Sequence, residues 1–238
     1  MLEIKQGGII LQKYLFILKS SPFFAGMTDA EILSVLHCVD AKISEKQTGD
    51  YIFRVGESTV VMGMVLSGSV LVIQEDLWGH RNIMAKIQAG EFFGESYAAT
   101  PGSVLNISVT ANEDSAIMLL NISRLLTLCP TACEHHARLI RNLVAVLSGK
   151  LLRFNDKITH MSKRSTREKL LSYLSSESIR QGRLEFHIPF DRQQLADYLC
   201  VERSAMSVEL SRLQKAGVLT TNRNYFVLHE VPEENSSI

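Results

Sequence analysis

The chain has 238 residues, of which 46% are hydrophobic and 21% charged, and its 25 basic side chains balance its 25 acidic ones. This composition excludes a disordered chain, and the absence of an apolar run of about 18–20 residues excludes a membrane span. The length suits two modest domains of a protein that we expect to be cytoplasmic, without a signal peptide.

The N-terminal part predicts helices followed by β structure. Thr28 and Glu31 form a capping box in front of an apolar helix. From about residue 40, short apolar runs alternate with glycine turns, as in an antiparallel sandwich or barrel. The strand-like runs are 51–53, 64–66, 69–73, 83–87, 107–109 and 116–120, and residues 77–80 are typical of a hairpin tip.

Residues 131–161 predict one long helix, because no proline interrupts them. Their apolar side chains recur every three or four positions and form a narrow stripe over more than four turns. Such a stripe is typical of a coiled-coil seam between two copies of a chain, and the alternative is that it packs on the chain's own β structure. The predicted dimer contacts are Ile140, Leu143, Leu147, Leu151, Phe154 and Ile158.

A helix-turn-helix is predicted at residues 191–215. It follows a polar, basic break at 162–166, a helix over 164–180 and a strand over 184–188. Asp191 is a natural N-cap for the first short helix, Ala196 is small where two helices must cross, and Cys200-Val201 is the tight turn between them. In this motif the N-terminal end of the second helix enters the major groove of DNA.

Polar side chains around this turn are the candidate DNA contacts. Arg203 has the forked guanidinium that binds guanine, and Arg223 lies in a turn between two expected strands, which form a wing. Residues 162–230 carry eleven basic and eight acidic side chains, a mild excess that fits DNA. The alternative is an α+β structural domain that binds no DNA. The full set of candidates is Arg192, Gln193, Gln194, Glu202, Arg203, Ser204, Ser207 and Arg223.

The order of these parts resembles the catabolite activator/FNR superfamily of transcription regulators. The resemblance covers about residues 20–230 and is carried by the helix-turn-helix and by glycine motifs at 49–57, 68–72 and 90–95. It implies an α+β chain with an N-terminal β-roll of the cyclic-nucleotide-binding type, a long dimerisation helix and a C-terminal winged helix-turn-helix. We place these parts at residues 1–122, 123–161 and 162–238.

The resemblance also implies partners. It predicts a homodimer on a near-palindromic operator in double-stranded DNA, switched by a small effector in the roll, and it leaves RNA polymerase open as a further partner. No membrane partner is implied.

One departure from the family pattern concerns the effector. Cyclic-nucleotide-binding members continue from a Gly-Glu pair, here Gly94-Glu95, to an Arg-Ser pair, but that place is Leu105-Asn106 in this chain. No lysine or arginine lies between Lys86 and Arg124. Since a buried phosphate without a cationic partner is costly, we predict that cyclic AMP does not bind.

We predict no cofactor and no metal site. Only Cys38 precedes Cys129, so the iron–sulfur cluster of the family's oxygen sensors cannot be built in the same way. Cys129, Cys133 and the adjacent His135-His136 are residue types that bind metals, but no second pair lies at finger-like spacing, so an incidental cluster is favoured. A redox or metal role for this pair of cysteines stays open.

What remains for an effector is an apolar pocket between the roll and the long helix. Leucine and isoleucine in place of a charged cassette suit an uncharged or aromatic ligand, and the alternative is that side chains simply fill the pocket. The candidate residues are Phe92, Phe93, Gly94, Glu95, Tyr97, Leu105, Asn106, Ile107, Leu139 and Leu143.

The sequence therefore predicts a DNA-binding transcription regulator, and its main alternative is a ligand- or protein-binding regulatory module that does not bind DNA. It does not predict an enzyme, because hydrolase, P-loop and zinc-peptidase motifs are absent. Val208 stands where family members often carry a second arginine. We therefore expect an operator that differs from the usual consensus and base reading that depends on Arg203.

Overall fold

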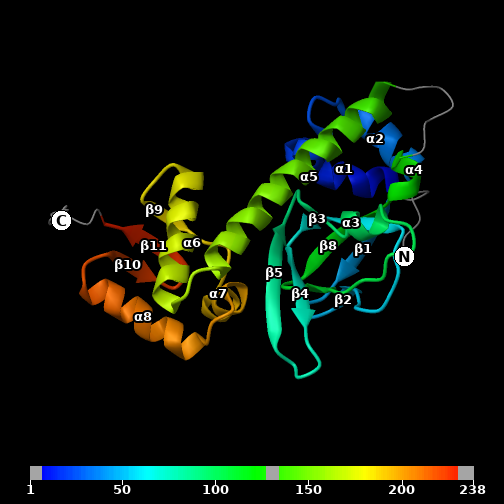
Figure 1. Cartoon of the computed structure of the whole chain (residues 1–238). Helices are drawn as coiled ribbons and strands as arrows, with labels where there is room; N and C mark the ends of the chain where they lie inside the picture. The colour runs from blue at the N-terminus through cyan, green and yellow to red at the C-terminus, as the bar shows by residue number, and fades with distance from the viewer. Residues whose placement is uncertain (1–6, 127–133, 230–238) are drawn as a thin grey trace. The chain divides into compact units, whose positions relative to one another are not determined.

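The computed structural model describes residues 7–126 and 134–229 of the chain (Figure 1). The chain divides into two compact units, residues 1–149 and 150–238, and helix α5 (Glu134–Met161) runs through the boundary between them. Each unit has its own buried apolar side chains.

The first unit begins with α1 (Gly7–Ser20), the short 3-10 turn η2 (Pro22–Phe24) and α2 (Asp29–Cys38). Helix α2 starts at the predicted capping box: the Glu31 backbone N–H donates to the Thr28 hydroxyl, and the Thr28 backbone N–H donates to Glu31 Oε2 at 2.6 Å. Two backbone donors at the helix start are thereby satisfied, which fixes where the helix begins.

Eight strands then form the predicted β-roll as two antiparallel four-stranded sheets, with the orders β1-β8-β3-β6 and β2-β7-β4-β5. The predicted runs coincide with six of these strands, and the tip at 77–80 joins β4 to β5 in a long hairpin (Figure 1). The other two strands, β1 and β6, are additional to the prediction. The bounds are β1 (Lys42–Lys46), β2 (Tyr51–Phe53), β3 (Val61–Ser67), β4 (Ser69–Glu75), β5 (Arg81–Gln88), β6 (Phe92–Phe93), α3 (Glu95–Ala98), β7 (Ser108–Ala111), β8 (Ser115–Asn121) and α4 (Ile122–Leu126).

The sheet that contains β6 has an apolar layer on each of its two faces, because successive side chains of a strand point to opposite faces. Phe93 points into the roll and meets Phe53 at 5.5 Å between ring centroids. Phe92 points outwards to the helices and meets Phe23 at 4.5 Å. A Cβ at Gly63 would lie 2.1 Å from the Phe93 ring, so only glycine lets this ring lie against the backbone of β3.

The second unit contains α6 (Thr166–Gln181), α7 (Arg192–Leu199), α8 (Arg203–Lys215) and a sheet of β9 (Glu185–His187), β10 (Leu219–Asn222) and β11 (Tyr225–Leu228) in the order β10-β11-β9. Helix α6 begins at a second capping box, formed by Ser165 and Glu168. The predicted break at 162–166, the following helix and the strand before residue 188 all lie within two residues of these bounds.

Candidate nucleic-acid interface

Helices α7 and α8 form the predicted helix-turn-helix. Asp191 caps α7, since its side chain accepts from the Gln194 backbone N–H at 2.8 Å. Ala196 is fully buried, which suits its position where the helices cross. Between the helices Cys200 adopts a left-handed conformation with φ of 52°, and this turn lets the chain reverse within a few residues.

Helix α8 presents the predicted polar end to solvent. Its inner face, Met206, Leu210 and Leu213, is buried in the second unit. Arg203, Ser204 and Ser207 are exposed, as is Glu202 at the N-cap. The structure therefore leaves the forked guanidinium of Arg203 available at the end of the helix that enters the groove in this motif.

At the start of α7 the structure separates the three predicted contacts. The Arg192 guanidinium lies over the Phe226 ring, donates to the Thr221 hydroxyl at 2.7 Å and is half-buried, and this burial lowers its pKa. The Gln194 side chain accepts from the Asp191 backbone N–H. Gln193 remains exposed and donates to Asp197. Two of the three side chains thus hold the domain together.

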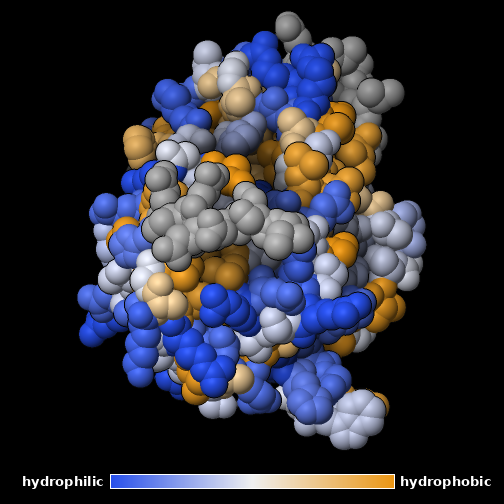
Figure 2. Space-filling view, turned by 60° about the vertical axis from the view of Figure 1, so that its left-hand side comes forward, coloured by the Kyte–Doolittle hydropathy of each residue, from blue (hydrophilic) through white to orange (hydrophobic). Residues whose placement is uncertain are grey.

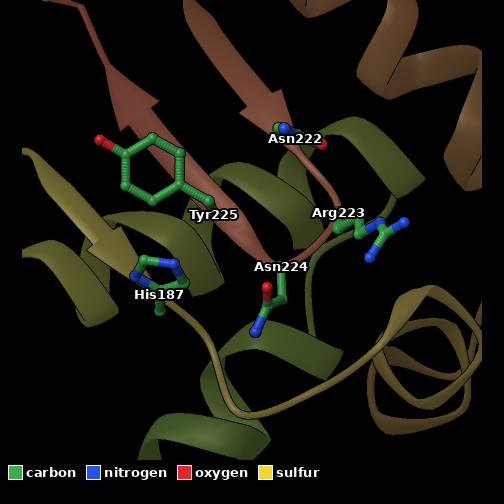
Figure 3. Close-up of a pocket in the computed structure, with 5 residues that line it drawn as sticks. All are labelled: His187, Asn222, Arg223, Asn224 and Tyr225. Carbon is green, nitrogen blue, oxygen red and sulfur yellow. The ribbon is translucent and has the colours of Figure 1, made fainter.

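The wing is a hairpin of β10 and β11 whose tip is Arg223. The backbone of Arg223 is left-handed, with φ of 51°, and the Arg223 side chain extends away from the rings of His187 and Tyr225 (Figure 3). A hollow at this end of the hairpin is lined by His187, Asn222, Arg223, Asn224 and Tyr225. Of these five residues, the sequence analysis predicts only Arg223 as a contact. His187 could not be found in this way, because only the pairing of β11 with β9 brings it beside Tyr225.

A buried polar cluster connects the end of α5 to the helix-turn-helix within the second unit. Lys157 is only 4% exposed, lies over the Tyr198 ring at 4.6 Å, and burial lowers its pKa to about 8. The His160 ring is 2.8 Å from the Ser172 hydroxyl and packs edge-on against Tyr173. Burial also raises the pKa of Tyr198 to about 12. Sequence reasoning did not find this cluster.

The apolar stripe of α5 divides into a covered and an exposed part. Leu143 is 5% exposed and packs in the core of the first unit, which corrects its prediction as a dimer contact, and Ile140 is half-buried. The stripe continues over residues that are between 36% and 64% exposed, with Val144 as a member that the prediction did not include. Apolar areas also interrupt the polar surface in Figure 2. The exposed members are Val144, Leu147, Leu151, Phe154 and Ile158.

The structure does not bring the predicted effector residues together in one pocket. Phe92, Leu139 and Leu143 belong to the layer between the roll and its helices. Phe93, Leu105 and Ile107 belong to the interior between the two sheets. The alternation of side chains along β6 sends Phe92 and Phe93 to opposite faces, so the predicted pocket residues are divided between two apolar layers, and effector binding between the roll and the long helix stays a prediction.

The remaining candidates lie at one edge of the roll interior. Tyr97 is half-buried, donates its hydroxyl to the Asn106 side-chain oxygen and has its pKa raised by burial. Leu105 is buried close by in the interior cluster, and Glu95 is also buried. A Cβ at Gly94, whose φ is 77°, would lie 2.5 Å from the Phe53 ring. A hydrogen-bonded polar pair, Tyr97 and Asn106, thus adjoins the apolar interior of the roll at this place.

Comparison with known families covers both units. A model of the cyclic nucleotide-binding domain matches residues 44–131, and a model of the Crp-like helix-turn-helix domain matches residues 168–233. Together they match well over half of the chain, in the order that the geometry shows. The chain belongs to the catabolite activator/FNR superfamily. Its members are regulators and not enzymes, so this chain is a DNA-binding transcription regulator and not an enzyme.

Solved structures of this superfamily share the fold. FixK2 from Bradyrhizobium japonicum is 21% identical over 80% of this chain and 93% of its own, with a TM-score of 0.62. CLP from Xanthomonas campestris, described as a c-di-GMP-responsive global regulator, is 20% identical over 86% and 100%, with a TM-score of 0.68. A mutant of CooA from Carboxydothermus hydrogenoformans is 19% identical over 85% and 93%, with a TM-score of 0.63. The comparison with curated proteins gives no match.

Two further observations concern only the described residues. None of their helices is long and apolar enough to cross a membrane. They contain no group of three metal-binding side chains, and the cysteines Cys129 and Cys133 lie outside them.

Proposed function

We propose that this regulator acts as a homodimer in which the α8 helix of each copy reads one half of a near-palindromic operator. The observation that carries the proposal is the exposed stripe of α5. An exposed run of large apolar side chains at coiled-coil spacing is a surface that water disfavours and that a second identical helix covers. An isologous pairing of this kind gives the two-fold symmetry that a palindromic operator requires.

The proposed symmetry is tested by mass and by sequence selection. Sedimentation of the full chain should give twice the mass of one chain. Selection of bound sequences from a random DNA pool should return two inverted half-sites spaced by about one turn of DNA. A monomer at micromolar concentration, or a selected site without inverted symmetry, would contradict the homodimer.

Within each half-site we propose that Arg203 forms the guanine contact and Arg223 a phosphate contact. The exposed guanidinium of Arg203 lies at the end of α8 that enters the groove, and Arg223 lies at the tip of the wing. We expect Arg203→Ala to weaken binding by about 1–3 kcal/mol and to relax the preference at one base position. We expect Arg223→Ala to weaken all sequences about equally and to reduce the salt dependence. An unchanged base preference in Arg203→Ala would contradict its role.

We further propose that the effector is an uncharged or aromatic small molecule and not a cyclic nucleotide. The support is the absence of any basic residue from 87 to 123, together with the hydrogen-bonded pair Tyr97 and Asn106 next to the buried Leu105. Isothermal titration should detect no cyclic AMP binding, and micromolar affinity would contradict this.

Thermal-shift screening with phenolic and carboxylic metabolites should find a stabilising compound whose effect Tyr97→Ala reduces.

A further inference from the structure

Val208 occupies the middle of the outward face of α8. Residues of an α-helix follow each other at about 100° around its axis. On that count Val208 points almost directly away from the buried face formed by Met206, Leu210 and Leu213. Its side chain is 50% exposed. It thus lies where the helix faces outwards, between the Ser204 side of the helix and Arg212.

No packing role within the second unit explains a valine at this position. A β-branched side chain on an exposed helical surface is less favourable than alanine, lysine or glutamine, and packing must normally offset that cost. The residues one turn away, Ser204 and Arg212, are exposed and polar, and Arg212 is paired with Glu209. Residues that break a local rule without a structural gain concentrate at functional sites.

The chemistry of the side chain limits what it can read. Valine neither donates nor accepts hydrogen bonds, so it cannot select guanine, adenine or cytosine by their polar edges. The C5-methyl group of thymine is the apolar group that base pairs present in the major groove. We propose that Val208 is a specificity-determining residue that packs against the C5-methyl group of a thymine in each half-site. This inference rests on the proposed reading of an operator by α8.

The test removes one methyl group from the DNA and, separately, shortens one side chain of the protein. In the operator selected for the wild type, each thymine is replaced in turn by deoxyuridine, symmetrically in both half-sites, which removes only the methyl group. We expect one thymine position to show a loss of about fourfold in affinity per half-site, the value for burial of about one methyl group. The other thymine positions should show no loss, and fluorescence anisotropy measures each Kd.

Variants of the protein assign that loss to Val208. Val208→Ala should bind the thymine and deoxyuridine operators equally, and Val208→Ile, which keeps the apolar contact, should still discriminate between them. Val60→Ala, at an exposed valine of the first unit, should behave like the wild type. Thermal melting checks that each variant is folded.

Each result decides a different claim. If the wild type binds every deoxyuridine operator as well as the thymine operator, or if Val208→Ala still discriminates, the inference about Val208 is overturned while the operator itself stands. If selection returns no preferred sequence, the proposed operator reading is overturned and the role of Val208 with it.

Discussion

The two halves of α5 carry apolar side chains at the same spacing but differ in what covers them. In the first half Leu139 and Leu143 are buried against the helices of the roll. Polar contacts reinforce this packing, since the Asn142 side chain donates to the carbonyl oxygens of Phe23 and Ala25 at 2.8 and 3.0 Å. In the second half Leu151 and Ile158 are more than 60% exposed.

This difference shows what a periodic stripe specifies. A spacing of three and four residues determines which side chains share a face of a helix, but it does not determine which surface that face meets. The first half of the stripe completes a core within the chain, and the second half has no cover among the described residues. We therefore expect substitutions in the two halves to affect different properties.

The largest expected effect is the loss of the dimer. In Leu151→Asp/Ile158→Asp, four carboxylates would have to be buried in the pair of helices, so dimerisation should weaken more than about 1,000-fold. Operator affinity should fall by about 100-fold or more, because a single α8 then binds without the help of its partner. Sedimentation and anisotropy measure both. Thr159→Asp adds one carboxylate per chain away from the stripe and should keep the dimer; equal effects of the two variants would remove the basis for a stripe-mediated dimer.

The first half should respond in stability instead. Leu143→Ala removes a buried side chain and leaves a cavity, so the free energy of unfolding of the first unit should fall by about 2–5 kcal/mol. Leu147→Ala, one turn further on and partly exposed, should change this free energy little and should weaken the dimer. Urea unfolding monitored at several protein concentrations separates these effects. The prediction is wrong if Leu147→Ala lowers the free energy of unfolding more than Leu143→Ala does, and Leu143→Ala weakens the dimer more.

On the buried side of the second half of α5, we expect one substitution to raise the free energy of unfolding instead of lowering it. Burial lowers the pKa of Lys157 to about 8 in the folded chain, from the ordinary lysine value of 10.5. Between these values the unfolded state binds more protons, so the Lys157 contribution makes the free energy of unfolding rise with pH over this window, and below pH 8 the full penalty applies. Lys157→Met should stabilise the second unit at pH 7 by about 1–3 kcal/mol, after loss of the contact with Tyr198, and should abolish this rise.

The matched control for this variant is Lys163→Met, at an exposed lysine just beyond α5. It should leave both the stability at pH 7 and its dependence on pH unchanged. Denaturant unfolding at pH 7 and pH 9 measures both variants. A destabilised Lys157→Met protein would show that the ammonium group supports the fold rather than weakening it.

The smallest effect concerns the polar anchor of the first half. Asn142→Ala removes two hydrogen bonds to backbone carbonyls and should cost about 1–2 kcal/mol. Asn155→Ala, on the exposed surface of the second half, should cost less than about 0.5 kcal/mol. A thermal melt of each variant is sufficient. Equal costs would mean that the contacts of Asn142 with Phe23 and Ala25 do not hold α5 on the roll.

Local signals explain what the sequence could predict. The capping residues Thr28 and Asp191, the turn at Cys200 and the hairpin tip at 77–80 depend on side chains within a few positions of one another, and all were found at the predicted places. Strand β1 was missed because its residues are mostly polar and half-buried, and β6 because it has only two residues.

Contacts between distant segments explain what could not be predicted. The effector residues were predicted to line one pocket between the roll and the long helix, but Phe92 and Phe93 face different layers. Arg192 was predicted as a DNA contact, whereas its guanidinium lies over the ring of Phe226, 34 positions later. The burial of Lys157 depends on Tyr198, which the helix-turn-helix brings to it. None of these pairings leaves a periodic trace in the sequence.

The wing tip suggests how this protein balances stability against affinity. Arg223 holds a left-handed backbone conformation that glycine adopts without strain and that costs other residues about 1–2 kcal/mol. Glycine at this position would relieve that strain but would remove the cation that we propose contacts a phosphate. Arg223→Gly should therefore melt at a higher temperature and bind DNA more weakly, a trade-off that Arg223→Asn, also tolerant of this conformation, should reproduce.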